Sequence, residues 1–291
     1  MKIAITGGRG LIGRALLDRL PASADVAVLS RHPEAAELPG LRAGIAVHAT
    51  DYDEPSLTRI FRDRDAVVHL AARRPGSAND ESCRDNVGRD FAVFSACEAC
   101  QIPNVVFASS RGVYGVRPAP WRETTPPRPE TVYGLAKVQS ERAAEDFNRR
   151  GLAIKSLRLA QILGWGEREG SMVATFLRQA SERQTLSVRV SDGLVREYVY
   201  VKDVAEAIIA ALRHPDRSGV FNVGSGETTT IRGLAERINA AFGNAGNLRI
   251  EEPLKDIREH SLMDSTKFCE TFAWAPRWTL ATAIVDLATR A

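Results

Sequence analysis

TGGRGLIG, residues 6–13, decides the fold class of this chain. It follows the apolar run KIAIT at residues 2–6, and apolar residues at helical spacing continue after it until Pro21. A buried strand, a glycine-rich turn and a helix in this order are typical of a dinucleotide-binding unit. The glycines let the backbone approach a pyrophosphate, and the helix N-terminus offers free N–H groups to the phosphates. We therefore expect a dinucleotide to be bound by Gly7, Gly10, Leu11, Ile12 and Gly13.

The same alternation of strands and helices continues along the chain. Further strand-like runs occupy residues 25–30, 44–50, 65–72, 104–110 and 152–160, with helical segments between several of them. Strands that alternate with helices predict a parallel sheet that is covered on both faces. After residue 160 the pattern predicts helices at about 172–181, 203–212, 231–242 and 279–290, and strands at about 195–203 and 219–225.

Composition excludes several classes of protein. The 291 residues are 44% hydrophobic and 26% charged, which is typical of a soluble globular protein. A net charge of +3 is too small to indicate binding to nucleic acid or to an anionic membrane. The chain has no apolar run of about 18 residues that could span a bilayer and no signal-peptide core. We expect a cytoplasmic protein that acts on a small molecule.

Two of the four cysteines, Cys97 and Cys100, form a C-x-x-C motif. They lie in an apolar stretch at helical spacing, and the other two cysteines are isolated. A zinc site needs four ligands at matched spacing. We therefore predict buried helix cysteines and no metal site.

The end of the second expected strand bears on the choice of nicotinamide cofactor. An acidic residue there would bind the ribose hydroxyls of NAD, but Ser30 and Arg31 stand in its place. A hydroxyl and a guanidinium suit a 2′-phosphate, which favours NADP(H). The alternative is that Arg31 points to solvent and that NAD(H) is bound. Asp51 is either a partner for the adenine amine or a solvated loop acid. The other residues expected at the cofactor are Tyr52, Leu70, Ala71 and Ala72.

TVYGLAKVQSE, residues 131–141, places Lys137 four residues after Tyr133. On a helix this spacing puts both side chains on one face. An ammonium beside a phenol stabilises the phenolate, so such a tyrosine can exchange a proton near neutral pH. Taken alone, this stretch is better explained as a surface pair without a function.

Four motifs in order carry a resemblance to a known family: the glycine turn, HLAA (69–72), SSRGVYG (109–115) and YGLAK (133–137). With them the chain resembles the extended short-chain dehydrogenase/reductases. More narrowly it is similar to the NAD-dependent epimerase/dehydratase family, which modifies nucleotide sugars. The resemblance covers nearly the whole chain and implies a catalytic trio of Ser110, Tyr133 and Lys137. Tyr133 would be the general acid or base, Lys137 would hold the nicotinamide ribose, and Ser110 would hydrogen-bond the substrate oxygen.

The resemblance also implies an architecture. We expect the α/β class, with a Rossmann-type doubly wound parallel sheet and a smaller C-terminal substrate-binding lobe. The dinucleotide-binding domain would comprise residues 1–163 and 198–224, and the lobe residues 164–197 and 225–291. A homodimer would form through the helices at about 86–101 and 133–150.

Substrate-binding residues are implied in the same way. Arg196 in REYVYV matches the arginine that meets the diphosphate of the substrate. Pro253 stands at the place of the family's second arginine, and Arg258 is the nearest substitute. Asn86 would be a structural hydrogen-bonding residue near the sheet, or simply a helix N-cap.

Some positions depart from the family pattern. Arg111 and Gly112 replace the Asp-Glu pair with which the dehydratases eliminate water, so sugar dehydration is not expected. Arg73 and Arg74 follow HLAA at the rim of the expected pocket. With Arg111 they indicate an acidic group on the substrate, or else they are solvated arginines.

Four functions are compatible with these residues. An NADPH-dependent reductase would act on a keto group, commonly at C4, of a nucleotide sugar. An epimerase would keep its NAD bound and return the hydride to the same sugar. A third enzyme would act on a non-nucleotide alcohol or ketone, and a dinucleotide-sensing regulator would not turn over at all. The intact trio argues against the regulator, and Ser30 with Arg31 favours the reductase.

Overall fold

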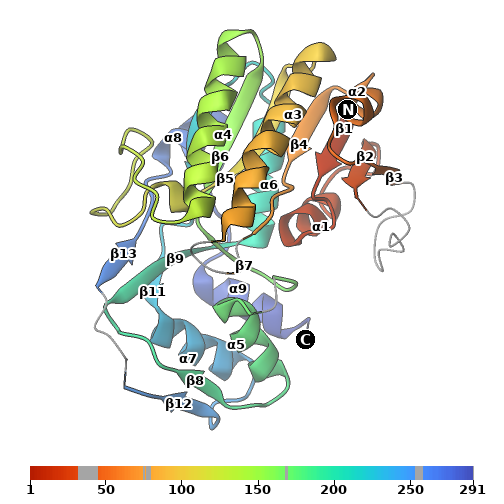
Figure 1. The fold of residues 1–291 in the computed structure, drawn as a ribbon. Coiled ribbons are helices and arrows are strands. Elements are labelled where there is room, and N and C mark those ends of the chain that lie inside the picture. The colour runs from red at the N-terminus through yellow and green to blue at the C-terminus, as the bar shows by residue number, and fades with distance from the viewer. Residues whose placement is uncertain (32–44, 75, 77–79, 168–169, 253–257, 291) are drawn as a thin grey trace.

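The computed structural model describes residues 1–31, 45–74, 76, 80–167, 170–252 and 258–290. In this part of the chain a parallel sheet of seven strands forms the larger layer (Figure 1). Its order is β10-β6-β5-β4-β1-β2-β3. The bounds are β1 Lys2–Thr6, β2 Asp25–Ser30, β3 Ala46–Ala49, β4 Ala66–His69, β5 Asn104–Ser110, β6 Ala153–Leu159 and β10 Gly219–Val223. The predicted fold class is confirmed.

Helices cover both faces of this sheet. The helices α1 (Leu11–Leu17) and α6 (Val201–Leu212) pack together on one face. The helices α2 (Glu54–Phe61), α3 (Asp85–Ala99) and α4 (Val132–Arg149) form the other layer, with α3 and α4 side by side in Figure 1. The two faces of the sheet carry two separate hydrophobic cores, because side chains along a strand alternate between faces. On β1, Ile3 and Ile5 belong to one core and Ala4 to the other.

The order of the strands alone predicts where a ligand binds to the large sheet. The strands β2 and β3 are added to the sheet on one side of β1, and β4, β5 and β6 are added on its other side. The order in which strands are added therefore reverses between β1 and β4. At such a switch point, loops leave the sheet in opposite directions and open a crevice at the carboxyl ends of the strands.

A second group of elements lies below the large sheet in Figure 1. The strand β9 (Leu194–Tyr200) pairs with three short strands: β7 (Gln161–Leu163), β11 (Thr228–Thr230) and β13 (Glu259–Ser261). The strands β8 (Leu186–Val188) and β12 (Leu248–Ile250) form a separate pair. The helices here are α5 (Met172–Ser181), α7 (Ile231–Ala241) and α9 (Leu280–Ala288), while α8 (Thr266–Phe272) packs against β10.

The helices after residue 160 agree with the sequence pattern to within about two residues at each end, as expected for boundaries. The short strands β7, β8, β11, β12 and β13, and the helix α8, were not predicted. The strand β9 crosses the expected domain boundary at residues 197 and 198, and the division into two domains stays a prediction. Among the described residues, no helix combines the length and hydropathy that a membrane crossing requires.

Candidate active site

A cleft of about 820 Å³ opens where β1, β2, β4 and β5 end. It brings together residues that the sequence predicted separately for cofactor, catalysis and substrate. The predicted residues that line it are Gly7, Gly10, Leu11, Ile12, Gly13, Ser30, Arg31, Tyr52, Leu70, Ala71, Ala72, Arg73, Arg74, Ser110, Arg111 and Tyr133. One cleft can therefore hold a dinucleotide and a reacting group side by side.

The glycine turn depends on the absence of side chains. Gly7 has a φ of 70°, in the left-handed region, and its carbonyl accepts a hydrogen bond of 2.9 Å from the Gly10 N–H. A Cβ on Gly13 would lie 2.5 Å from the Gly7 carbonyl oxygen and 2.5 Å from the Gly8 Cα. The start of α1 thus packs directly against the turn, so that its free N–H groups face the cleft.

Ser110 and Tyr133 reach the cleft from two elements that are locked together. Ser110 ends β5 and caps the short helix η3 (Arg111–Val113), where its Oγ accepts from the Gly112 N–H at 3.1 Å. A Cβ on Gly134 would lie 2.4 Å from the Gly112 carbonyl oxygen, so α4 begins in contact with this turn. Ser109 is buried and donates to Glu141 at 2.5 Å. The geometry therefore favours Ser110 over Ser109 as the reactive serine.

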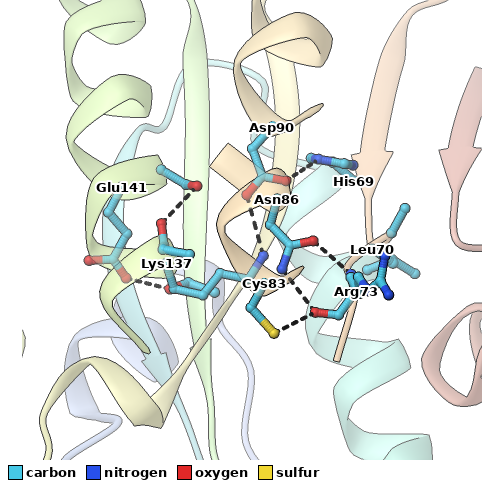
Figure 2. Close-up of polar contacts among 12 residues, drawn as sticks. His69, Leu70, Arg73, Cys83, Asn86, Asp90, Lys137 and Glu141 are labelled. Atoms are coloured by element: carbon cyan, nitrogen blue, oxygen red, sulfur yellow. Dashed lines mark hydrogen bonds and ion pairs between the residues drawn. The ribbon is translucent and has the colours of Figure 1, made fainter. Parts of the chain in front are cut away.

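Lys137 lies beneath the cleft. Its side chain is 1% exposed, and its Nζ lies 5.9 Å from the centroid of the Tyr133 ring and 4.4 Å from that of Phe107. A counter-charge is close by, since the Oδ2 atom of Asp90 lies 3.5 Å from Nζ. Figure 2 shows Asp90 on α3 between Lys137 and His69. The ammonium is thus held by a buried carboxylate on the neighbouring helix.

Asp90 was not predicted, although the sequence carried a signal for it. On α3 it lies on the same face as Asn86, Val93, Phe94 and Cys97, all of which are buried. A carboxylate on the apolar face of a helix needs a partner, because an unpaired buried charge is costly. Other charged residues that line the cleft were also missed: Arg9, Arg89, Glu130 and Glu259.

Asn86 has the structural role that the resemblance implied. Its Nδ2 donates to the Arg73 carbonyl at 2.9 Å, and its Oδ1 accepts from the Arg73 N–H at 2.7 Å (Figure 2). It thereby ties the loop after β4 to α3. The alternative, a helix N-cap, is wrong, because the N-cap position of α3 is Arg84 and Asn86 lies inside the helix.

Several predicted residues lie outside the lining of the cleft. Asp51 is exposed, and neither it nor Arg258, also exposed, is among the described residues that line the cleft. Pro253 lies outside the described residues. The roles predicted for these positions stay predictions.

Arg196 makes a two-pronged ion pair with Glu259, with N–O distances of 2.7 and 2.8 Å. Arg111 lies nearby and donates to the Ser261 Oγ at 3.3 Å. Burial and the neighbouring charge of Arg196 lower the pKa of Arg111, and burial raises the pKa of Tyr198 to about 12. Arg111 and Glu259 line the cleft here, whereas Arg196, paired with Glu259, is not among the described residues that line it.

The chain is similar to known proteins. A family model described as "NAD dependent epimerase/dehydratase family" matches residues 3–224. The dTDP-4-dehydro-6-deoxyglucose reductase of Escherichia coli is 27% identical, over 94% of this chain and 92% of its own.

Solved structures resemble the whole chain. The UDP-N-acetylglucosamine 4-epimerase from Bacillus cereus is 32% identical with a TM-score of 0.89, covering 100% of this chain and 96% of that one. The UDP-glucose 4-epimerase of Thermus thermophilus, in complex with NAD, is 28% identical with a TM-score of 0.83, covering 99% and 98%.

Proposed function

Since this chain belongs to the NAD dependent epimerase/dehydratase family, an enzyme family of nucleotide-sugar epimerases and reductases, we propose that it reduces the C4 keto group of a nucleotide sugar with NADPH. The observation that carries the proposal is the shared cleft: Ser110 and Tyr133 line it together with the glycine turn and Arg31. Tyr133 donates a proton to the substrate oxygen, and Ser110 hydrogen-bonds that oxygen as charge develops. NADPH supplies the hydride when it is bound.

The charge of the cleft supports a ligand with several phosphates. The arginines that line it among the described residues outnumber the two glutamates, Glu130 and Glu259. They are Arg9, Arg31, Arg73, Arg74, Arg89 and Arg111. Guanidinium groups bind phosphate oxygens in pairs of hydrogen bonds, so this lining suits a dinucleotide with a 2′-phosphate beside a second phosphorylated ligand.

Two alternatives have observations in their favour. The similarity to 4-epimerases favours an epimerase that keeps NAD bound. The ion pair of Arg196 with Glu259 favours a substrate without a diphosphate, because a diphosphate would have to displace the Glu259 carboxylate. We rank the reductase first, because Ser30 and Arg31 stand where NAD-binding proteins place an acid.

Identifying the dinucleotide that the purified protein releases on denaturation separates these functions. We expect the denatured protein to release little NAD. A separate sample of the folded protein without cofactor should bind NADPH more tightly than NADH. Stoichiometric NAD would contradict the reductase and support the epimerase.

The assembly proposed here is a homodimer that works in the cytoplasm. Phe91 on α3 and Leu135 on α4 are large apolar side chains that are 52% and 42% exposed. Because α3 and α4 pack side by side, a second copy of this pair would form a four-helix interface. Light scattering should give twice the mass of the chain, and a monomer would exclude this interface.

A further inference from the structure

A chain of buried polar contacts joins the end of β1 to Lys137. The Thr6 Oγ1 accepts from the backbone N–H groups of Leu70 at 3.2 Å and Ala71 at 3.1 Å. It also lies 2.6 Å from the Nδ1 of His69. The Tyr52 side chain also hydrogen-bonds Thr6, and burial raises the pKa of the Tyr52 phenol.

The next link of the chain shows that Asp90 is ionised. The Nε2–H of His69 donates to the Oδ1 of Asp90 at 2.8 Å, and the other carboxylate oxygen faces Lys137 at 3.5 Å (Figure 2). Burial alone would raise the pKa of Asp90, but the charge of Lys137 and the hydrogen bond from His69 outweigh burial and lower it. His69, Asp90 and Lys137 are each at most 1% exposed. Lys137 is thus half of a buried ion pair.

The ion pair with Asp90 weakens the electrostatic effect of Lys137 on the Tyr133 phenol. The Lys137 Nζ lies 3.5 Å from Asp90 but 5.9 Å from the centre of the Tyr133 ring. A carboxylate close to the ammonium opposes its field at the phenol, and the two charges cancel more fully as the distance grows. The ammonium therefore stabilises the phenolate less than an unpaired lysine would.

We propose that Asp90 is a positioning residue that offsets the charge of Lys137 and keeps Tyr133 a phenol. This inference rests on the function proposed above, in which Tyr133 is the acid. In the reduction, bound NADPH would supply the hydride: the C4–H bond of its nicotinamide would break, leaving NADP⁺, and a C–H bond would form at the carbonyl carbon. The π electron pair moves to the oxygen, which takes the phenol proton, and the phenolate regains a proton from water. Oxidation of an alcohol, the first step of an epimerase, starts from the phenolate instead. Asp90 thus favours reduction.

Other charged groups lie on α3 and α4 and on the elements packed against α4. Arg89 on α3, Arg111 on η3 and Glu130 before α4 line the cleft with Tyr133. Arg158 on β6 is paired with Glu141 of α4. The helix η2 (Glu81–Arg84) carries an exposed ion pair between its first and last residues. A substitution at Asp90 leaves all of these in place.

Asp90→Asn tests the proposal, because it removes the charge and keeps an oxygen for the His69 N–H. The ammonium is then unopposed and favours the phenolate. The pH at which the rate of ketone reduction falls on the alkaline side should be lower by about one unit. Oxidation of the alcohol at pH 7 should become faster. Thr6→Val is the matched control: it removes the hydrogen bonds of Thr6 to His69, Leu70 and Ala71 and keeps the charge of Asp90. It should lower stability and weaken cofactor binding without moving the pH profile of kcat.

Each outcome has a distinct meaning. An unmoved profile in Asp90→Asn, or loss of activity at every pH with cofactor binding retained, would overturn the role of Asp90. If Asp90→Asn does not fold, Asp90→Ser, which leaves space for a water, should show the same shift. Activity that survives Tyr133→Phe would overturn the proposed function itself.

Discussion

Replacing Gly13 by alanine should lower both the stability of the fold and its affinity for the dinucleotide. The new Cβ would lie 2.5 Å from the Gly7 carbonyl oxygen and from atoms of Gly8, and none of these backbone atoms can rotate away. Overpacking costs about 1–3 kcal/mol, and this contact belongs at the upper end. Alanine in place of glycine in a helix returns about 1 kcal/mol. We expect a net loss of about 2 kcal/mol in the free energy of unfolding, together with roughly a tenfold or greater loss in NADPH affinity.

Gly88→Ala is the matched control on α3. It makes the same chemical change within a helix, but its Cβ would meet no atom within 4 Å. This variant should gain up to about 1 kcal/mol from helix propensity and bind NADPH normally. Urea unfolding and NADPH fluorescence titration measure both quantities. Equal changes in stability for the two variants would refute the close approach at Gly13.

Two other changes test the chemistry and the core. Tyr133→Phe should lower kcat by at least about 100-fold with an unchanged dissociation constant for NADPH, because only the phenolic proton is removed; a nearly normal kcat would exclude the acid role. Burial lowers the pKa of Lys155 from its usual 10.5 to about 8, and its Nζ donates to Asn104 and to the His214 carbonyl. Folding therefore releases a proton between these pH values. The stability of the wild type relative to Lys155→Met should rise with pH above about 8, by at most about 1.4 kcal/mol per unit in urea titrations. A constant difference would mean that Lys155 is charged in the fold.

The large sheet was predictable because its strands carry strong local signals. KIAIT and NVVFASS are apolar on both faces and end at glycine or serine, so their bounds follow from the letters alone. The strands β7, β8, β11, β12 and β13 have three residues each, too few to show a period of two. Their pairing is set by distant partners, as when β13 lies beside β9.

In the cleft, too, residues of local motifs were predictable and contacts between distant residues were not. Residues of contiguous motifs, such as Gly7 and Tyr133, lie in one cleft as the resemblance implied. The ion pairs that modify the site join residues far apart in sequence: Asp90 with Lys137, and Arg196 with Glu259. No local pattern states that two such residues meet, because their proximity depends on how helices and strands pack.

The proposed reaction is net hydride transfer from NADPH to a nucleotide sugar. The most direct measurement incubates the protein with 4-deuterated NADPH and a set of dTDP- and UDP-4-keto sugars, and weighs the products by mass spectrometry. We expect one sugar to gain a deuterium on carbon and one NADPH to be oxidised for each sugar reduced. Interconversion of two sugars without consumption of NADPH and without deuterium in the product would contradict it.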